Sequence, residues 1–343
     1  MVFRDVFPRG SKILVVGLGG GGDVVSTAML ALALRREGYQ ALIGSVVWER
    51  YVNDPVPGPV SLSEIQGIKM RGEHYGVVTG ECTAMRGGRI VRFQAANVAE
   101  ALDEKVFVFD LYGGEESLAK GFLEAVDNEG FTAVMGVDVG GDILARGCEE
   151  GLWSPLADSI GLSALSRNEL ASRAQCILAV HSIGADGELD PGYVLGRIML
   201  VAREQGYFGA RGITRNDVEV LKKILEHASS EASSVQIRAF EGTARREEIR
   251  SGSRMIDVTL LQTITFLLDP AAAYRLCQAA RLVRGTRSIN EARRKLNANG
   301  VYTELDLEID VQAFIEKHGR LPEARELLDI KWMGRKRLGL CRL

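Results

Sequence analysis

The sequence predicts an α/β protein in which helices cover both faces of a mostly parallel sheet. Five short apolar segments carry this prediction, at 12–17, 41–47, 105–111, 132–139 and 176–182. Because they are apolar almost throughout, they are typical of strands that are buried on both faces. Helical patterns lie between most of them. We therefore expect a Rossmann-like, doubly wound fold, with an inserted hairpin and a helical C-terminal extension.

The first predicted helix follows the first strand and reads "VVSTAMLALAL" (24–34). It is apolar nearly all round, which indicates a buried helix, and Gly38 is placed as its C-terminal cap. Further helices are expected at 115–130, 154–170, 191–206 and 214–229.

The alternation of strands and helices breaks between the second and third strands. A proline-rich extended segment (53–60) leads into "SLSE" (61–64), which predicts a capping box. The segments 75–80 and 89–93, on either side of "MRGG", are expected to pair as a hairpin. We place this hairpin insert near 70–95, where it would rim or cover a site.

After about residue 234 the pattern changes again. It predicts a strand pair (235–240 and 254–260), arginine-rich helices within 271–298 and a last helical pair around "HGRLPEARELL". We divide the chain into a core of 1–245 and a C-terminal extension of 246–343, and we expect the extension to pack on the core as one structural unit.

Composition narrows the class of protein. A net charge of −3 with 25% charged residues argues against a general attraction to nucleic acid or membrane. No 18-residue uncharged apolar run or signal peptide is present, and the five cysteines form no CxxC pair. We expect a cytoplasmic homo-oligomer that has no membrane partner and neither a zinc knuckle nor a disulfide framework.

The glycine run "GLGGGG" follows the first strand and precedes the first helix, which is the setting of a G-x-G-x-x-G fingerprint. Glycines allow backbone N–H groups to approach an anion, and a helix N-terminus attracts it. The predicted phosphate ligands are therefore Gly17, Gly19, Gly20, Gly21 and Gly22.

Two observations weaken a nicotinamide cofactor at this loop. The ribose-binding acid is expected about 20 residues past the last glycine, but Glu49 lies 27 residues past Gly22. Asp23 stands where a phosphate would sit, so it needs a cation, acts as a catalytic carboxylate or simply caps the helix. These alternatives stay open at this point.

A second loop repeats the pattern, since Gly140, Gly141 and Asp142 reproduce "GGD" after the fourth strand. The carboxyl ends of parallel strands meet at one edge, so Asp23, Asp138 and Asp142 are expected to converge. The fifth strand ends in "HSIGADGELDPG", which adds Asp186 to this edge or is a turn followed by a helix cap.

Clustered carboxylates suit Mg²⁺ or acid/base catalysis. We predict catalytic roles for Asp23, Asp138 and Asp142, with Asp138 and Asp142 also as metal ligands. Gly140, Gly141 and Asp186 are predicted to bind the ligand.

Five ordered segments carry a family resemblance: "GLGGGGDVVSTAMLALALRREGY", "VVWERYVNDPVPGP", "VDVGGDILARGCEEGLWSPLADS", "GADGEL" and "GYFGARGIT". With them the chain resembles the family of domain of unknown function 1152, chiefly archaeal, from about residue 10 to beyond 300. The resemblance implies no particular reaction. It implies a cytoplasmic protein and marks Asp23, Asp138, Gly140, Gly141, Asp142 and Asp186 as part of the family's characteristic segments.

We therefore expect an enzyme that acts on a phosphorylated or nucleotide-like small molecule at a Gly/Asp-lined cleft. Hydrolysis, lyase chemistry and group transfer all remain open. One alternative is an NAD(P)-dependent oxidoreductase. The other is a non-catalytic nucleotide-binding or regulatory protein, whose basic tail (331–343) would be a contact surface.

Overall fold

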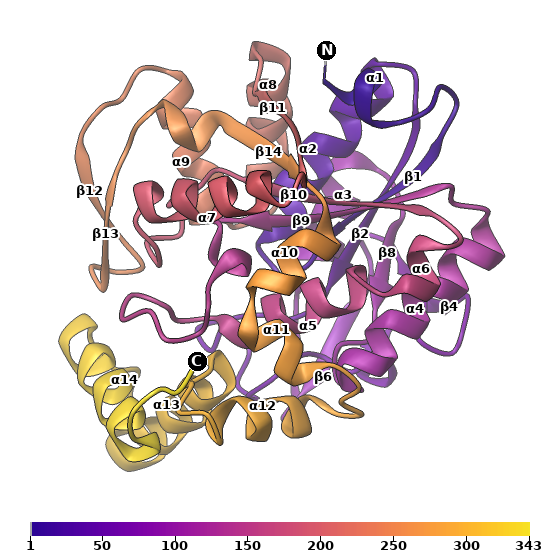
Figure 1. The fold of residues 1–343 in the computed structure, drawn as a ribbon. Helices are drawn as coiled ribbons and strands as arrows, with labels where there is room; N and C mark the ends of the chain where they lie inside the picture. Colours follow the sequence, from indigo (N-terminus) through magenta and orange to yellow (C-terminus); the bar gives the residue numbers. More distant parts are fainter. Residues whose placement is uncertain (1) are drawn as a thin grey trace.

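The computed structural model describes residues 2–343 and places a nine-stranded, mostly parallel sheet between helices (Figure 1). Five parallel strands form its centre and confirm the five predicted segments. They are β1 (Lys12–Gly17), β2 (Gln40–Val46), β8 (Val106–Phe109), β9 (Ala133–Val139) and β10 (Gln175–His181). Their order is β8-β2-β1-β9-β10, so the direction of winding reverses between β1 and β9.

Antiparallel pairs extend the sheet at both edges. Beside β10 lies β14 (Ile264–Leu268), followed by β11 (Tyr207–Gly212). Beside β8 lies β5 (Tyr75–Val78), followed by β4 (Lys69–Met70).

The expected hairpin between the segments 75–80 and 89–93 is wrong in its first strand. The hairpin around Gly87 and Gly88 joins β6 (Thr83–Arg86) to β7 (Arg89–Val91), and β3 (Ile65–Gln66) completes this small sheet. The segment 75–78 belongs instead to the main sheet. Tyr75 stacks on Phe109 of β8 with ring centroids 5.8 Å apart, and this buried aromatic contact holds β5 in place.

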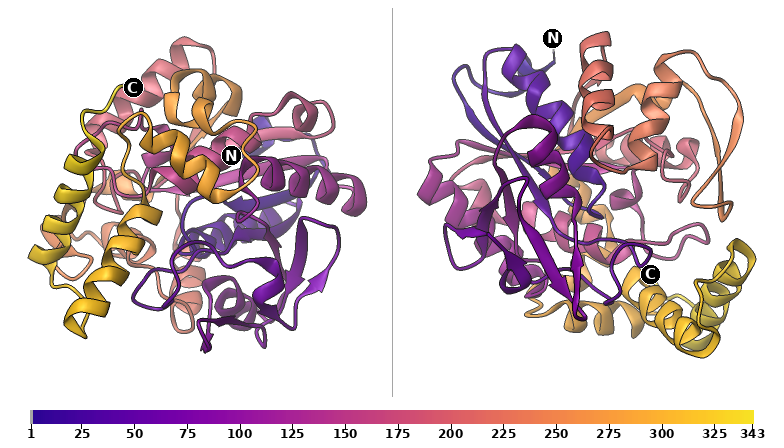
Figure 2. Two further views of the ribbon diagram at one scale, coloured as in Figure 1. Left: turned by 90° about the horizontal axis from the view of Figure 1, so that it is seen from below. Right: turned by 180° about the vertical axis from the view of Figure 1, so that it is seen from behind.

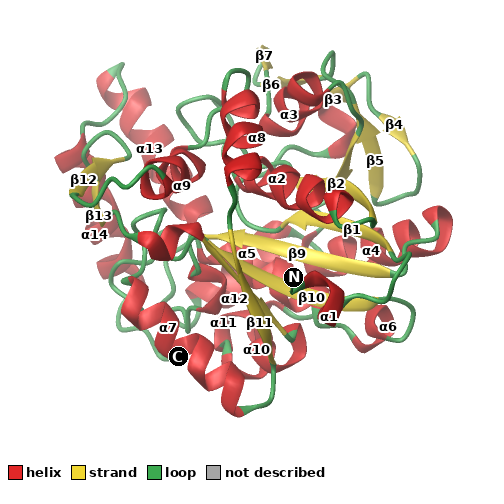
Figure 3. Ribbon diagram, turned by 90° about the horizontal axis from the view of Figure 1, so that it is seen from above, coloured by secondary structure: helices red, strands yellow, loops and turns green. Residues whose placement is uncertain are grey.

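Helices pack on both faces of the sheet, as Figure 3 shows from above. On β1, Ile13 and Val15 belong to one hydrophobic cluster, whereas Leu14 and Val16 belong to the other. The first cluster is covered by α1 (Phe3–Val6), α2 (Asp23–Arg36), α3 (Gln94–Leu102), α8 (Arg215–Leu225) and α9 (Glu231–Phe240). The second is covered by α4 (Gly114–Glu129), α5 (Pro155–Leu165), α6 (Asn168–Ala171), α7 (Pro191–Arg203), α10 (Pro270–Leu276), α11 (Gln278–Val283) and α12 (Ile289–Asn297).

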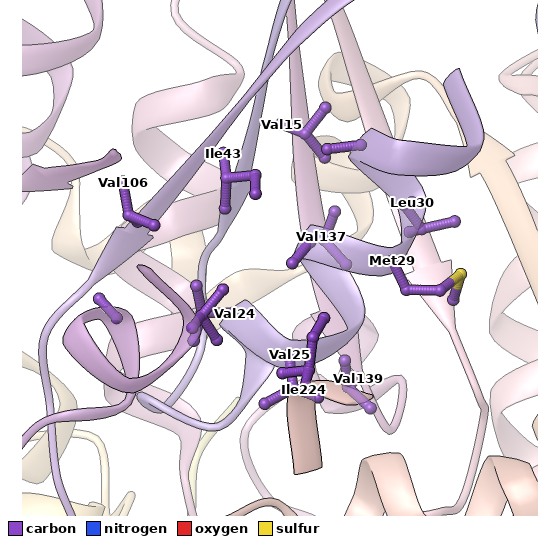
Figure 4. Packing of buried hydrophobic residues seen from close by; sticks show 14 of the residues in the cluster. Val15, Val24, Val25, Met29, Leu30, Ile43, Val106, Val137, Val139 and Ile224 are labelled. Atoms are coloured by element: carbon purple, nitrogen blue, oxygen red, sulfur yellow. The ribbon is translucent and has the colours of Figure 1, made fainter. Parts of the chain in front are cut away.

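The apolar helix α2 lies at the centre of the first cluster. Figure 4 shows its side chains Val24, Val25 and Met29 around Val137 of the sheet. Ten of its fourteen residues are buried, so the helix is fixed by packing. The rigid helix holds Asp23, its first residue, at the carboxyl end of β1.

The segment 235–240, expected to be a strand, is the end of helix α9. Ser230 caps this helix by accepting a hydrogen bond from the N–H of Ser233 (3.3 Å). Ala232, Val235 and Ala239 are buried at helical spacing. The second half of the expected pair is a strand, β13 (Arg254–Asp257), but its partner is β12 (Arg246–Ile249).

The C-terminal helices α13 (Glu304–His318) and α14 (Ala324–Leu338) confirm the last predicted helical pair. Figure 2 shows them at the periphery of the molecule in both views. The β12–β13 hairpin reaches toward the start of α14 (Figures 1 and 2). A Cβ atom on Gly252, at the tip of the hairpin, would lie 3.9 Å from Ala324.

No disulfide framework is expected from the sequence, but the structure contains one disulfide, between Cys148 and Cys341. Their separation of 193 residues gives no local spacing motif, and only the return of the C-terminus to the loop after β9 brings them together. Within residues 2–343, no helix has both the length and the apolar character needed to span a membrane.

Candidate functional site

A cavity of about 470 Å³ lies at the carboxyl edge of the parallel strands. Loops after β1, β2, β9 and β10 form its walls together with α5, α13, the start of α14 and the β12–β13 hairpin. Ten carboxylates line it: Asp23, Glu49, Asp138, Asp142, Asp158, Asp186, Glu188, Glu231, Glu304 and Glu308. The predicted residues Asp23, Asp138, Asp142 and Asp186 are thus brought together.

Asp23, Asp138 and Asp158 form the first carboxylate trio, in which one oxygen from each residue lies within 4.8 Å of the others. Asp23 is the first residue of α2, and the N-cap position belongs to Gly22. The Asp23 carboxylate accepts the N–H of Gly19 (3.0 Å). Asp23 therefore turns back toward the glycine loop instead of capping the helix.

The other members of the first trio come from β9 and α5. Asp138 accepts a hydrogen bond from the N–H of Gly141 (2.9 Å). Asp158 is 3% exposed, and its Oδ1 has no hydrogen-bond partner among residues 2–343. A buried carboxylate oxygen without a donor is costly, so this atom is suited to a ligand from outside the chain.

Asp142, Asp186 and Glu188 form the second carboxylate trio, again with one oxygen from each residue within 4.8 Å of the others. Gly140 makes room for it, because a Cβ atom there would lie 2.4 Å from the carboxyl carbon of Asp186. Gly140 and Gly141 have φ values of +131° and +96°, which side chains disfavour. The second GGD loop therefore needs both glycines for its backbone conformation, and Gly140 also for the close approach of Asp186. Asp138 and Asp142, predicted as ligands of one metal ion, lie in different trios.

Burial and crowding of like charges raise the pKa values of these carboxyl groups. The pKa of Asp138 rises to about 7, through burial and then the charge of Asp186. The pKa of Asp186 also rises to about 7, through burial and then Glu188. Asp23, Asp142 and Asp158 have pKa values well above the ordinary range, mainly because of burial.

Glu188 is the exception in the second trio. Burial opposes its ionisation, but Arg254, the hydroxyl of Ser154 and the N–H of Trp153 outweigh burial and lower its pKa. Arg254 Nη1 lies 3.0 Å from Glu188 Oε1. One carboxylate of the six is therefore neutralised by a neighbouring guanidinium.

The glycine loop is shaped largely by carboxylates and carbonyl groups. Gly19 donates to Asp23, and Gly21 donates to the carbonyl of Trp48 (2.9 Å). A Cβ atom would lie 2.6 Å from Asp23 Oδ2 at position 19 and 2.7 Å from Glu49 Oε1 at position 21. The amides of Gly20 and Gly22 donate no hydrogen bond within residues 2–343. Gly17 ends β1 and does not line the cavity.

Helices α5 and α13 contribute three lining acids, away from the glycine loops. Asp158 stands in "PLADSIGLSAL", a helix with every residue buried, so an acid in an apolar segment was the available signal. Glu304 of α13 accepts the N–H groups of Leu156 and Ala157 (2.9 and 2.7 Å), and burial raises its pKa to about 8. Glu308 accepts from Trp48 Nε1 (3.0 Å), and burial raises its pKa to about 7.

Several residues near the predicted edge lie outside the cavity. His181 is fully buried, contacts Thr265 Oγ1 through Nδ1 (2.7 Å), and has a pKa lowered to about 4 by burial. Asp190 caps α7 by accepting the N–H of Tyr193 (3.1 Å). In the basic tail, Arg335 donates to carbonyl groups after β9, among them that of Glu149 (2.8 Å).

Comparison with known proteins gives one family. The profile of the family described as "Protein of unknown function (DUF1152)" matches residues 14–312, which include every carboxylate of the cavity. No curated protein and no solved structure matches the chain. Since the matched segment covers most of the 343 residues and contains the whole acidic site, the chain belongs to the DUF1152 family.

Proposed function

We propose that the protein is an enzyme that uses divalent cations, held by the two carboxylate trios, to act on a phosphorylated or nucleotide-like small molecule. The observation that carries this proposal is the pair of trios at one edge of the sheet, together with the unpartnered Asp158 Oδ1. Carboxylate oxygens are the ligands that Mg²⁺ prefers, and the site lacks cysteine.

The strand order supports a Rossmann-like, doubly wound description of the sheet. The chain passes from β1 to β2 and β8, and then returns to β9 and β10 on the other side of β1. Ligands of open α/β sheets bind at the carboxyl ends of the strands, where the winding reverses. The loops after β1 and β9, which carry both GGD sequences, flank that point.

The two carboxylate trios would hold the cations, which would supply charge neutralisation and polarisation at a phosphoryl oxygen of the substrate. The amides of Gly20 and Gly22, at the N-terminus of α2, supply further donors for phosphate. In the cation-free protein the pKa values of Asp138 and Asp186 are raised to about 7, so cation binding would displace protons from these two carboxyl groups near neutral pH. Hydrolysis, elimination and group transfer are all compatible with these groups.

The test is a panel of phosphorylated metabolites and nucleotides, assayed for phosphate release and product formation with Mg²⁺, with Mn²⁺ and with chelator. We expect cation-dependent turnover that Asp158→Asn abolishes. The matched control is Asp329→Asn, because Asp329 is exposed on α14 outside the cavity. A turnover rate that is unchanged by chelator, or full activity of Asp158→Asn, would contradict the proposal.

An NAD(P)-dependent oxidoreductase is the second candidate, and Glu49 is the observation that favours it. This acid follows β2 and approaches Gly21 closely, despite its late position in the sequence. However, two N–H groups of the loop already donate within the chain, one to Asp23 and one to the carbonyl of Trp48, and are therefore not free to bind a pyrophosphate. Fluorescence titration with NADH and NADPH separates the candidates, since tight binding without any cation would favour the oxidoreductase.

The third candidate is a non-catalytic nucleotide-binding or regulatory protein. Cation-dependent nucleotide binding without turnover of any substrate in the panel would favour the non-catalytic alternative. We also expect the protein to form a homo-oligomer and to be cytoplasmic.

A further inference from the structure

The cavity also has a basic wall, which we define as Arg50, Arg250 and Arg254. Within residues 2–343, these are the only cationic residues that line the cavity. Arg50 follows β2, whereas Arg250 and Arg254 belong to the tip and the second strand of the β12–β13 hairpin. The basic wall therefore brings together two segments that lie about 200 residues apart in the sequence.

Hydrogen-bond donors of this wall are left without partners. Arg254 is 7% exposed and uses Nη1 for the carbonyl of Asp186 (2.8 Å) and for Glu188, but its Nε is buried and donates to nothing within residues 2–343. Arg250 pairs through Nη1 with Glu231 (3.3 Å), and its Nε is likewise buried without a partner. Buried donors are normally satisfied, so these atoms are suited to an acceptor that enters the cavity.

The positive charges of the wall also repel one another. The pKa of Arg250 is lowered to about 9, first by burial and then by the charges of Arg50 and Arg254. Glu231 and Asp186 act in the opposite sense but do not cancel this effect. An anion placed among the three guanidinium groups would relieve the repulsion and accept their free hydrogen bonds.

The hairpin tip holds Arg250 at the cavity in a conformation that its residues disfavour. Arg250 and Ser251 both have φ of +55°, followed by Gly252 at +85°. Consecutive left-handed residues in a hairpin turn are normally Asn or Gly, and other side chains cost on the order of 1 kcal/mol each. Arg250, Ser251 and Ser253 all line the cavity. The disfavoured backbone conformation of this turn therefore costs stability at residues that line the cavity.

We propose that the basic wall binds a second anionic group of the substrate, a phosphate or a carboxylate, distinct from the group held at the carboxylate trios. This inference rests on the proposed function for the first group. Together they define the substrate class as a small molecule with two anionic groups, one bound through cations and one bound directly by arginine. Because Arg250 and Arg254 lie on the hairpin, the hairpin recognises the end of the substrate that does not react.

The test is calorimetric titration of the cation-free protein, in chelator, with inorganic phosphate in one series and malonate in another. We expect saturable binding of one or both anions, which identifies the type of group. Arg250→Gln and Arg50→Gln should each weaken it about tenfold or more, since each removes charge-assisted hydrogen bonds. Arg246→Gln should leave it unchanged, because Arg246 is exposed on the same hairpin and does not line the cavity.

The absence of saturable binding of either anion, or equal affinity in wild type, Arg250→Gln and Arg50→Gln, would overturn the inference. Circular dichroism of each variant verifies that the fold is retained, and the exposed Arg50 gives a substitution that removes no buried ion pair. Failure of the proposed function looks different. In that case anions still bind to the basic wall in chelator, but no substrate is turned over with cations.

Discussion

Two buried charged clusters of this molecule are built in opposite ways. In the insert, Arg86 is 2% exposed and every nitrogen of its guanidinium has a partner. It donates to Asp54 (2.8 Å), to Glu64 (2.8 Å) and to the carbonyl groups of Val56 and Gly58 (2.9 and 2.7 Å). In the cavity, by contrast, six acids of the same sign face one another, and Asp158 Oδ1 has no donor within residues 2–343.

The difference separates structure from proposed function. A buried charge whose hydrogen bonds are all made within the chain stabilises the loops around it and needs no ligand as a further partner. Like charges that are crowded and partly unsatisfied cost stability, and such sites are retained where something else binds.

The largest effect is expected from Arg86→Met. This substitution leaves Asp54 buried without its partner, so we expect the free energy of unfolding to fall by about 3–5 kcal/mol. Chemical denaturation measures it. Arg71→Met is the control, because the Arg71–Glu129 pair is half exposed on its arginine side and should contribute less than about 1 kcal/mol. Equal losses in the two variants would remove the distinction between the clusters.

Divalent cations should stabilise the cavity by a somewhat smaller amount. A cation that binds only the folded state at about 100 times its Kd adds about 2.7 kcal/mol. We expect Mn²⁺ or Mg²⁺ to raise the melting temperature of Asp158→Asn less than that of the wild type and of Asp329→Asn, because the variant loses the first trio and keeps the second. The same rise in all three proteins would show that no cation binds at the first trio.

The stability of the cation-free protein should fall as the pH rises. Glu49, Asp138, Asp186 and Glu308 have pKa values raised to about 7, and Glu304 to about 8. The folded state therefore holds more protons than the unfolded state above the ordinary carboxyl pKa, so stability present at low pH is lost as pH rises through about 7–8.

Melting in chelator between about pH 5 and pH 8 measures this effect. We expect a loss of about 2 °C, roughly 1–2 kcal/mol for a chain of this size, and cations should reverse it most strongly at the upper end. A melting temperature that rises across this range would contradict the account of the raised carboxyl pKa values.

The smallest effect is expected from Asp158→Asn without cations. The change removes one of several like charges and breaks no hydrogen bond to Oδ1, so stability should rise or stay within about 1 kcal/mol of wild type. Asp54→Asn should instead lose about 1–3 kcal/mol, because it weakens the contact with Arg86. A loss of more than about 2 kcal/mol in Asp158→Asn would mark Asp158 as structural.

The central strands could be predicted from the sequence because burial on both faces leaves an apolar run that is visible locally. Strand β11 could not, since "YFGARG" is half exposed and contains two glycines. The position of β5 depends on the stacking of Tyr75 on Phe109, a contact between distant residues. Segment 235–240 resembles a strand in composition, but its buried residues follow helical spacing.

The candidate site could be predicted in part for a similar reason. Strand ends in a parallel sheet share one edge, so Asp23, Asp138 and Asp142 were expected together and are found around one cavity. Glu304 and Glu308 reach the cavity from α13, and their contacts span about 150 and 260 residues of sequence. No local sequence pattern predicts such contacts. The Cys148–Cys341 disulfide could not be predicted for the same reason.

Anomalous diffraction from crystals of the protein soaked in Mn²⁺ tests directly whether the two carboxylate trios hold cations. We expect an anomalous peak bounded by Asp23, Asp138 and Asp158, and a second bounded by Asp142, Asp186 and Glu188, each coordinated by carboxylate oxygens. A cavity without any peak, at a Mn²⁺ concentration that populates other carboxylates of the surface, would contradict it.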